Sequence, residues 1–444
     1  MAKFPFSVDY KRLFFYGVGG VSMSALAEYF LKQNFEVFGF DKVKSPKIDS
    51  LIGLGLKFIT PDQLKDKGII IVYTSAVEDN PDFILLKESG FKVIKRSTLL
   101  ALVQSAYRKN IAVSGSHGKT TTTSMLAHVL KCANLHPTAF IGGEDYSFSN
   151  LLIGKRKVAV VEACEYKGNF LDLIGDIKIV LNIDDDHLDS YGSLENLKSA
   201  FNDFVKPSTA VVNSDDINSQ NIRGKKTITF GIKNPADYTA KDIELSDKTT
   251  FTVCYKGKPK TKITLNVKGV HFVYNALSVV ASARVLGVSF KWIKKGLEKF
   301  LGVKRRNERV GSFLSTDVFC DYAHHPTEID ATLSSIDLNT TAVVFQPHTY
   351  SRTRLLKDKF ISVLSKVNTL IVYKTYPARE KYDKRGSART LYLSLISKTK
   401  NKVYYADSTA DLEKIIKGFT RIKTLLFVGA GDIYEIAINL TDKK

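Results

Sequence analysis

A strand–turn–helix pattern occurs three times along this chain and constrains the fold more than any other feature of the sequence. Each time, a short apolar strand runs into a turn rich in glycine or histidine, and an amphipathic helix follows. These segments run from Leu13 to Lys32, from Ile111 to Ala133 and from Asp317 to Ser335. Strands that alternate with helices in this way indicate parallel sheets covered by helices, so we expect an α/β fold.

Chain length and local composition suggest three domains. The chain has 444 residues, which at about 150 residues per domain is enough for three. The stretch from Lys225 to Gly269 differs from its surroundings, because it is rich in Thr, Lys and Val and alternates like a small antiparallel sheet. We predict domains over residues 1–106, 107–302 and 303–444.

The composition excludes several classes of protein. Hydrophobic residues make up 44% and charged residues 25%, which is typical of a folded globular chain. No apolar run has the length of a membrane helix, and the N-terminus lacks the pattern of a signal peptide. The four cysteines are far apart without a CxxC pair, so neither a disulfide framework nor a zinc site is indicated. We expect a reduced cytoplasmic protein that does not insert into a membrane.

The net charge of +20 raises the question of nucleic acid. Most of the excess is lysine, however, and it is spread along the whole chain. The sequence has no helix-turn-helix, zinc-finger or RNP-type signature. We therefore expect no nucleic-acid partner, and either anionic small substrates or a lysine-biased composition explains the charge.

The first glycine turn has the layout of a dinucleotide-binding turn. Gly17 and Gly19 follow a strand, Ser22 stands where a third glycine is usual, and Asp41 ends the next strand. Glycines allow backbone N–H groups to approach a diphosphate at a helix N-terminus, and the acid further on contacts a ribose. A tight strand-to-helix turn without a ligand also selects glycine, so the spacing leaves both interpretations open.

The second turn is a stronger signal for phosphate binding. Gly115-Ser-His-Gly-Lys-Thr120 follows a strand and opens a helix that continues with three more threonines. Lys119 is placed to neutralise phosphate charge, Thr120 to reach Mg²⁺, and the backbone N–H groups to hold the phosphates. The spacing departs from GxxxxGK[ST], because Val113 occupies the position of the earlier glycine.

Acidic residues and histidines gather where the predicted strands end. One strand ends in Glu162-Ala-Cys-Glu165 and another in Asp184-Asp-Asp-His187. Because ligands bind at the carboxyl ends of parallel strands, we expect these groups to lie near the phosphate loop and to hold Mg²⁺. A solvated loop or a helix cap is the alternative for the aspartate run. Six of the eight histidines fall in such turns: His117, His187, His271, His324, His325 and His348.

Together these motifs resemble those of the Mur ligases, and the resemblance extends from Gly17 to Asp432. It is carried by residues 17–28, 115–123, 182–187, 302–306, 321–328, 345–353 and 429–432. The pair Tyr-Ala-His-His-Pro-Thr-Glu and Gln-Pro-His-x-Tyr-Ser-Arg-Thr points to the alanine-adding members. The sequence departs from the usual family pattern at Cys164, Tyr166, Phe272, Thr349 and Arg379.

The resemblance implies both an architecture and a reaction. A Rossmann-like N-terminal domain holds a UDP-sugar. A P-loop central domain with a parallel sheet and a small antiparallel sheet binds ATP. A Rossmann-like C-terminal domain brings the amino acid. The implied enzyme is an ATP-dependent ligase, with ATP and Mg²⁺ as cofactors. It joins L-alanine to the carboxylate of UDP-N-acetylmuramate through an acyl phosphate in peptidoglycan precursor synthesis, as a monomer or homodimer.

Three other functional hypotheses are compatible with parts of the sequence. A ligase that recycles murein peptides onto the same UDP-sugar keeps the chemistry and changes the substrate. A nucleotide-binding oxidoreductase built on the Gly17 turn leaves the Lys119 loop unexplained. A non-catalytic ATP-dependent switch is disfavoured by the intact Lys119, Glu162, His187 and Arg306.

The resemblance also implies roles for individual residues. The implied catalytic residues are Lys119, Glu162, His187, Arg306 and His324. The implied ATP-binding residues are Gly115, Ser116, His117, Gly118, Lys119, Thr120, Thr121, His271, Asn275, Arg306 and Asp321. The implied UDP-sugar-binding residues are Gly17, Gly19, Gly20, Ser22, Asp41 and Ser75. The implied amino-acid-binding residues are Tyr322, His348 and Arg352, and the implied metal ligands are Thr120, Glu162 and His187.

Overall fold

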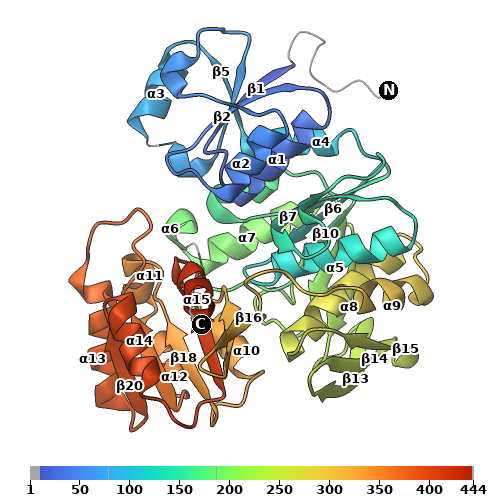
Figure 1. Ribbon diagram of the computed structural model, residues 1–444. Helices are drawn as coiled ribbons and strands as arrows, with labels where there is room; N and C mark the ends of the chain where they lie inside the picture. Colours follow the sequence, from blue (N-terminus) through green and yellow to red (C-terminus); the bar gives the residue numbers. More distant parts are fainter. Residues whose placement is uncertain (1–10, 79, 187, 443–444) are drawn as a thin grey trace. The chain divides into compact units, whose positions relative to one another are not determined.

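The computed structural model describes residues 11–78, 80–186 and 188–442 (Figure 1). The chain forms two compact units. The first holds residues 1–244, 250–266 and 272–301, and the second holds residues 245–249, 267–271 and 302–444. In the described ranges, no helix is both long and apolar enough to span a bilayer.

The first sheet of the first unit is a doubly wound parallel sheet. Its strand order is β3 (Lys57–Phe58), β2 (Glu36–Phe40), β1 (Arg12–Tyr16), β4 (Ile70–Tyr73) and β5 (Lys92–Lys95). The helices that follow these strands are α1 (Val21–Leu31), α2 (Pro46–Gly53), α3 (Pro81–Glu88) and α4 (Arg96–Gln104). The strand order reverses between β1 and β4, and this is where ligands bind in sheets of this kind.

The second sheet of the first unit has ten strands. Its order is β15 (Lys258–Leu265), β14 (Thr249–Tyr255), β13 (Tyr238–Leu245), β12 (Lys226–Gly231), β11 (Thr209–Asn213), β10 (Ile177–Val180), β6 (Lys109–Ser114), β9 (Val158–Glu162), β7 (Thr138–Asp145) and β8 (Ser149–Leu152). Its helices are α5 (Lys119–Cys132), α6 (Leu188–Tyr191), α7 (Leu194–Val205), α8 (Val270–Val285) and α9 (Phe290–Glu298), with the short segment η3 (Tyr166–Asp172) after β9. Strands β6, β9 and β10 run parallel, so the loops that follow them open at one edge.

The two sheets of the first unit share a hydrophobic core. Helix α1 is apolar on nearly all sides, because it lies between its own sheet and strand β7 of the second sheet. Tyr29 on α1 contacts Phe140 on β7, with ring centroids 5.5 Å apart. This packing fixes the Gly17 turn relative to the end of β9.

The second unit is built on a six-stranded sheet. Its order is β16 (Glu308–Phe313), β17 (Thr316–Asp321), β21 (Thr424–Val428), β18 (Thr341–Phe345), β19 (Thr369–Tyr373) and β20 (Lys402–Ala406). Its helices are α10 (Pro326–Leu333), α11 (Tyr350–Leu355), α12 (Lys357–Leu364), α13 (Ala388–Lys398), α14 (Thr409–Lys417) and α15 (Ile433–Thr441). Only β16 pairs antiparallel. Val343 and Phe345 face one core and Ala342 and Val344 the other, as expected for a strand buried on both faces.

The predicted α/β fold is confirmed, and the segment expected to be a small antiparallel sheet differs in one respect. Its first strand, β12, pairs in parallel with β11, and β13 then pairs with β12. The connections β13–β14 and β14–β15 are too short for a parallel crossover, so these strands form an antiparallel ribbon. The ribbon therefore extends the edge of the large sheet. Alternation along the sequence reports the exposed face of a strand, and it does not report which neighbour the strand pairs with.

Candidate functional site

The phosphate loop is held by the strand beside it. The backbone N–H of Ser116 donates to the carbonyl of Asn182 at 3.1 Å, and the N–H of His117 donates to the Asn182 side chain at 2.8 Å. Gly115 and Gly118 both have positive φ. A Cβ on Gly118 would lie 2.7 Å from Oδ1 of Asn275, so only glycine fits where α5 begins.

Lys119 is folded back onto this loop. Its Nζ donates to the carbonyl oxygens of Gly115 at 2.6 Å and Ser116 at 3.1 Å. It also forms an ion pair with the buried carboxylate of Glu165 at 3.0 Å. Burial alone would lower the pKa of Lys119, but Glu165 more than offsets this, and the pKa lies above its ordinary value. The lysine therefore stays charged where the loop would hold phosphates.

Glu162 and Thr120 meet at the start of α5. The Thr120 hydroxyl donates to Oε2 of Glu162 at 2.9 Å, and the backbone N–H of Gly142 on β7 donates to the same oxygen at 2.9 Å. A Cβ on Gly142 would lie 2.1 Å from this oxygen. A carboxylate beside a threonine hydroxyl is an oxygen donor set that suits Mg²⁺.

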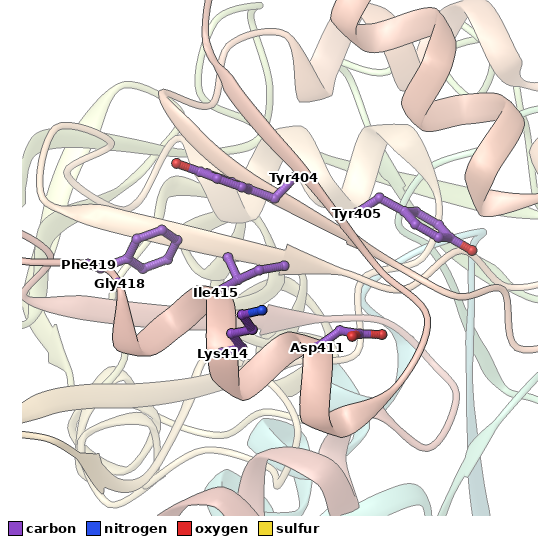
Figure 2. A pocket seen from close by; sticks show the side chains of 7 residues that line it. All are labelled: Tyr404, Tyr405, Asp411, Lys414, Ile415, Gly418 and Phe419. Atoms are coloured by element: carbon purple, nitrogen blue, oxygen red, sulfur yellow. The ribbon is translucent and has the colours of Figure 1, made fainter.

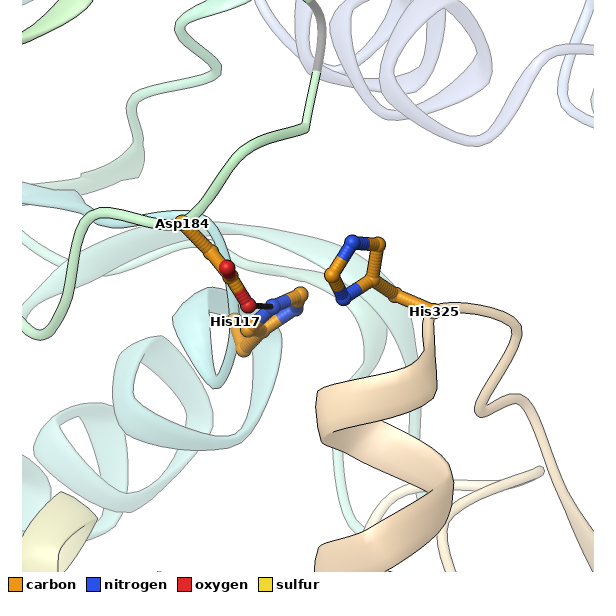
Figure 3. A group of neighbouring side chains, drawn as sticks. All are labelled: His117, Asp184 and His325. Atoms are coloured by element: carbon orange, nitrogen blue, oxygen red, sulfur yellow. Dashed lines mark hydrogen bonds and ion pairs between the residues drawn. The ribbon is translucent and has the colours of Figure 1, made fainter. Parts of the chain in front are cut away.

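His117 and Asp184 form a further polar contact at this edge. Nε2 of His117 lies 3.0 Å from Oδ2 of Asp184, as Figure 3 shows with a dashed line. The backbone N–H of Asp184 also donates to the hydroxyl of Ser116 at 2.9 Å. The predicted metal ligand His187 lies outside the described residues.

Three backbone N–H groups of the Gly17 turn donate hydrogen bonds to other groups of the protein. The N–H groups of Gly17 and Val18 donate to the carbonyl of Phe40, and that of Gly19 donates to Asp41 at 2.9 Å. A Cβ on Gly19 would lie 2.9 Å from this carboxylate. Asp41, expected to contact a ribose, thus fastens the turn itself. The first amides of a helix have no acceptor inside the helix, so those of α1 are available in principle to an anionic group.

Two cavities open where the first sheet meets the second. The main cavity has a volume of about 330 Å³. It is lined by Gly20, Val21, Ser22, Met23, Ala25, Thr74, Arg96, Leu100, Phe140, Ile141, Gly142, Glu162 and Cys164. The side cavity, about 160 Å³, is lined by Tyr73, Thr74, Ser75, Ala76, Lys95, Arg96, Ser97, Cys164, Tyr166 and Asn169. Gly20, Ser22 and Ser75 of the predicted UDP-sugar site and Glu162 of the predicted metal site therefore meet around shared walls.

Arg96 lines both cavities, and the sequence analysis did not select it. It is the first residue of α4, and its Nη1 donates to the hydroxyl of Ser22 at 2.9 Å. Burial lowers its pKa, and the negative charge of Glu162 acts in the opposite direction. The available signal was an arginine directly after strand β5, at the carboxyl-end edge of the first sheet.

In the second unit, predicted site residues gather where β17, β21 and β18 end. Asp321 accepts hydrogen bonds from the backbone N–H groups of Asn307 and Ala323, each at 2.8 Å. Burial raises its pKa to about 6, against the lowering effect of Arg306. The Arg306 guanidinium lies 5.0 Å from the centroid of the Tyr322 ring.

The predicted amino-acid residues form part of one row of rings. The Tyr322 and His324 centroids are 5.3 Å apart, and those of His324 and His348 are 5.8 Å apart. His348 stacks on Tyr376 at 5.5 Å with an interplanar angle of 9°. Nη1 of Arg352 lies 3.3 Å from Nδ1 of His348. The structure thus brings together Tyr322, His348 and Arg352, and it adds Tyr376, which the sequence analysis missed.

Comparison with known proteins shows which family the chain belongs to. The family descriptions that match are the Mur ligase catalytic domain over residues 12–108, the middle domain over 113–283 and the glutamate ligase domain over 305–431. The UDP-N-acetylmuramate–L-alanine ligase of Lachnospira eligens is 38% identical over 446 residues, covering 96% of this chain and 97% of that protein. The chain belongs to the Mur ligase family.

One more relative and two solved structures are also similar to this Mur ligase. The UDP-N-acetylmuramate–L-alanine ligase of Aquifex aeolicus is 38% identical and covers 95% of each chain. The crystal structure of UDP-N-acetylmuramate–alanine ligase from Thermotoga maritima matches with a TM-score of 0.82 and 29% identity, over 97% of this chain and 98% of that one. A murein peptide ligase from Psychrobacter arcticus, at 22% identity, shares the fold with a TM-score of 0.72 over 97% and 98% of the two chains.

The remaining predicted ATP residues of the Mur ligase lie near the loop or near Arg306. Asn275 faces Gly118 from helix α8, and Thr121 is buried in the first turn of α5. His271, one helical turn before Asn275, has its pKa lowered to about 4, first by burial and then by the charge of Arg306. His271 is therefore neutral at pH 7.

A further cavity of about 480 Å³ lies in the second unit (Figure 2). It is lined by Tyr404, Tyr405, Asp411, Lys414, Ile415, Gly418 and Phe419, from β20, α14 and the turn that follows α14. None of the described residues that we predicted for the site lines it.

Proposed function

We propose that this Mur ligase joins L-alanine to the carboxylate of UDP-N-acetylmuramate, with conversion of ATP to ADP and phosphate. Relatives that are 38% identical over almost their whole length are named UDP-N-acetylmuramate–L-alanine ligase. Their names support the substrate assignment, and the geometry of the first unit supports the chemistry.

The observation that carries the proposal is the main cavity. One of its walls is the start of α1, with Gly20 and Ser22, where the N-terminal amides favour an anionic ligand. Glu162 also lines the cavity, and it accepts a hydrogen bond from the hydroxyl of Thr120 at the phosphate loop. A UDP-sugar bound at the first wall therefore has its carboxylate directed to the place where a triphosphate ends.

The residues suit the activation of a carboxylate. Amide formation from a carboxylate in water is unfavourable, so an oxygen of the carboxylate first takes the terminal phosphoryl group of ATP. Two anions must approach each other for this step, and the charged groups of Lys119 and Arg96 offset their repulsion. The alanine amine then displaces phosphate from the acyl phosphate.

We assign Mg²⁺ to the oxygens of Thr120 and Glu162, with His187 as the third predicted ligand. Magnesium would supply charge neutralisation for the phosphates. Gly142 contributes to this site through its N–H, which orients the Glu162 carboxylate.

We assign the amino acid to the row of rings in the second unit. The Arg352 guanidinium matches a carboxylate in bidentate geometry. His348 and Tyr376, stacked face to face, form a flat wall that favours a small side chain.

An ADP-release assay with ATP, Mg²⁺ and UDP-N-acetylmuramate tests the proposal across a panel of amino acids. We expect ADP release to require both the UDP-sugar and L-alanine. Release with a murein tripeptide in place of L-alanine would favour the recycling ligase instead. Loss of ADP release without added Mg²⁺, and recovery on its return, would support the metal assignment.

We further propose that the enzyme acts in the cytoplasm. All four cysteines are free thiols, which is usual in a reducing compartment.

A further inference from the structure

The proposed reaction needs a group that removes a proton from the alanine ammonium, because only the neutral amine is a nucleophile. Two histidines of the row, His324 and His348, are next to each other and near Arg352. Their hydrogen bonds place the proton of the neutral ring on different nitrogens in the two imidazoles.

His348 has its lone pair engaged at Nδ1. Nη1 of Arg352 is 3.3 Å from this nitrogen, and arginine can only donate. In the neutral ring the proton therefore sits on Nε2. The pKa of His348 is lowered to about 4, first by burial and then by Arg352. At neutral pH, His348 can donate a hydrogen bond from Nε2, and it cannot accept a proton there.

His324 has the other tautomer. Its Nδ1 lies 3.0 Å from the carbonyl oxygen of Tyr322 and 3.4 Å from Oε2 of Glu328. Both oxygens accept, so Nδ1 carries the proton and Nε2 carries the lone pair. Glu328 also accepts the backbone N–H of His324 at 3.1 Å, so the carboxylate is held beside Nδ1.

The pair His324–Glu328 has the form of a base and the carboxylate that orients it. A proton added at Nε2 gives an imidazolium whose Nδ1–H faces the Glu328 carboxylate. Arg306 is 3.8 Å from the other oxygen of Glu328, so part of that negative charge is already balanced.

We propose that Nε2 of His324 is the general base that accepts the proton of the alanine ammonium. This inference rests on the proposed function. The proton moves from nitrogen to Nε2, and the freed lone pair forms the C–N bond with the acyl phosphate carbon. The C–O bond to phosphate then breaks, and phosphate leaves with the electron pair.

The test compares two nucleophiles with the full-length enzyme. His324→Asn keeps an N–H donor for the Tyr322 carbonyl and has no atom at the position of Nε2. With L-alanine, we expect kcat to fall by about 10²- to 10⁴-fold, the usual contribution of a general base. With hydroxylamine, which is neutral at pH 7, we expect hydroxamate formation to stay close to the wild-type rate.

Two histidine variants serve as controls. His136→Asn changes an exposed histidine with positive φ, which asparagine tolerates, and should leave both rates unchanged. His348→Asn should raise the KM for alanine more than it lowers kcat. Equal loss with both nucleophiles in His324→Asn, or an unchanged kcat with alanine, would overturn the base assignment. Absence of ADP release by the wild-type enzyme with either nucleophile would instead overturn the proposed function.

Discussion

At the scale of single residues, Gly142 shows how a missing side chain supports the predicted metal site. Its N–H donates to Glu162, and a Cβ there would collide with the same carboxylate. We expect Gly142→Ala to push Glu162 away from Thr120 and to raise the Mg²⁺ concentration for half-maximal rate by about 10- to 100-fold. Magnesium titration of ADP release measures this.

Gly53→Ala is the matched control for Gly142→Ala. Gly53 lies in helix α2, and a Cβ there meets nothing within 4 Å. This change should raise stability by about 0.5–1 kcal/mol and leave the magnesium dependence unchanged. An unchanged magnesium dependence in Gly142→Ala would show that Glu162 is not a metal ligand.

Arg352 carries a second prediction at this scale. Lysine retains the charge at this position but loses the planar fork, so Arg352→Lys should weaken binding of the alanine carboxylate. We expect the alanine KM to rise by roughly tenfold to a hundredfold, since a hydrogen bond to a charged group contributes about 1.5–3 kcal/mol. The KM values for ATP and the UDP-sugar should stay constant. Arg354→Lys is the control, because Arg354 lies on the exposed side of the same helix and forms an ion pair with Asp383. Equal alanine KM values in the two variants would remove Arg352 from the site.

At the scale of elements, the loop after β9 is joined to the phosphate loop by the ion pair Glu165–Lys119. Glu165 is 1% exposed and Lys119 13%, so removal of one partner leaves a poorly compensated charge. We expect Glu165→Gln to lower the free energy of unfolding by about 1–3 kcal/mol, because glutamine retains one acceptor. Denaturant unfolding measures this. Glu36→Gln, which breaks an exposed pair with Lys57, should change stability by less than about 0.5 kcal/mol. A similar small change in both variants would contradict the prediction.

Elements were predictable from the sequence wherever burial alone determined the pattern. The strand expected directly before Asp41 is β2, which ends at Phe40. The strand expected to run up to Asp184 ends earlier, at Val180. Residues Leu181 and Ile183 are buried beside the phosphate loop, so they look like strand residues in the sequence.

The site was predictable where a motif is local and hidden where it depends on packing. The contact of Thr120 with Glu162 follows from two motifs at adjacent strand ends. Arg96 and Tyr376 could not be selected in this way. Arg96 owes its position to the packing of two sheets against each other, and Tyr376 to its stacking on His348. Neither contact is marked by a characteristic spacing of residues along the sequence.

At the scale of the whole molecule, stability should depend on pH through Asp321. An ordinary aspartate has a pKa of about 3.9, and burial raises that of Asp321 to about 6. The folded state therefore binds this proton more tightly than the unfolded state. Its contribution to stability is complete below about pH 4 and is lost as the pH rises through about 6, a change of about 3 kcal/mol at 1.4 kcal/mol per pKa unit.

Unfolding measured between pH 4 and pH 7 tests this prediction. Relative to Asp321→Asn, the wild-type protein should lose stability as the pH rises across this range. Asp317→Asn, at an exposed position of the same strand, is the control and should follow the wild-type curve. A constant difference between wild type and Asp321→Asn would show that Asp321 does not titrate in this range.

The main cavity also bears on how resistance to an inhibitor could arise. A compound that fills it contacts the start of α1 and the carboxylate of Glu162 together, so it should compete with both the proposed sugar nucleotide and the proposed phosphates. Part of the lining is the backbone of Gly20 and Gly142, and at Gly142 a Cβ displaces Glu162. A substitution that excludes the compound there would also displace the predicted metal ligand Glu162, so escape mutations at Gly142 should carry a loss of activity.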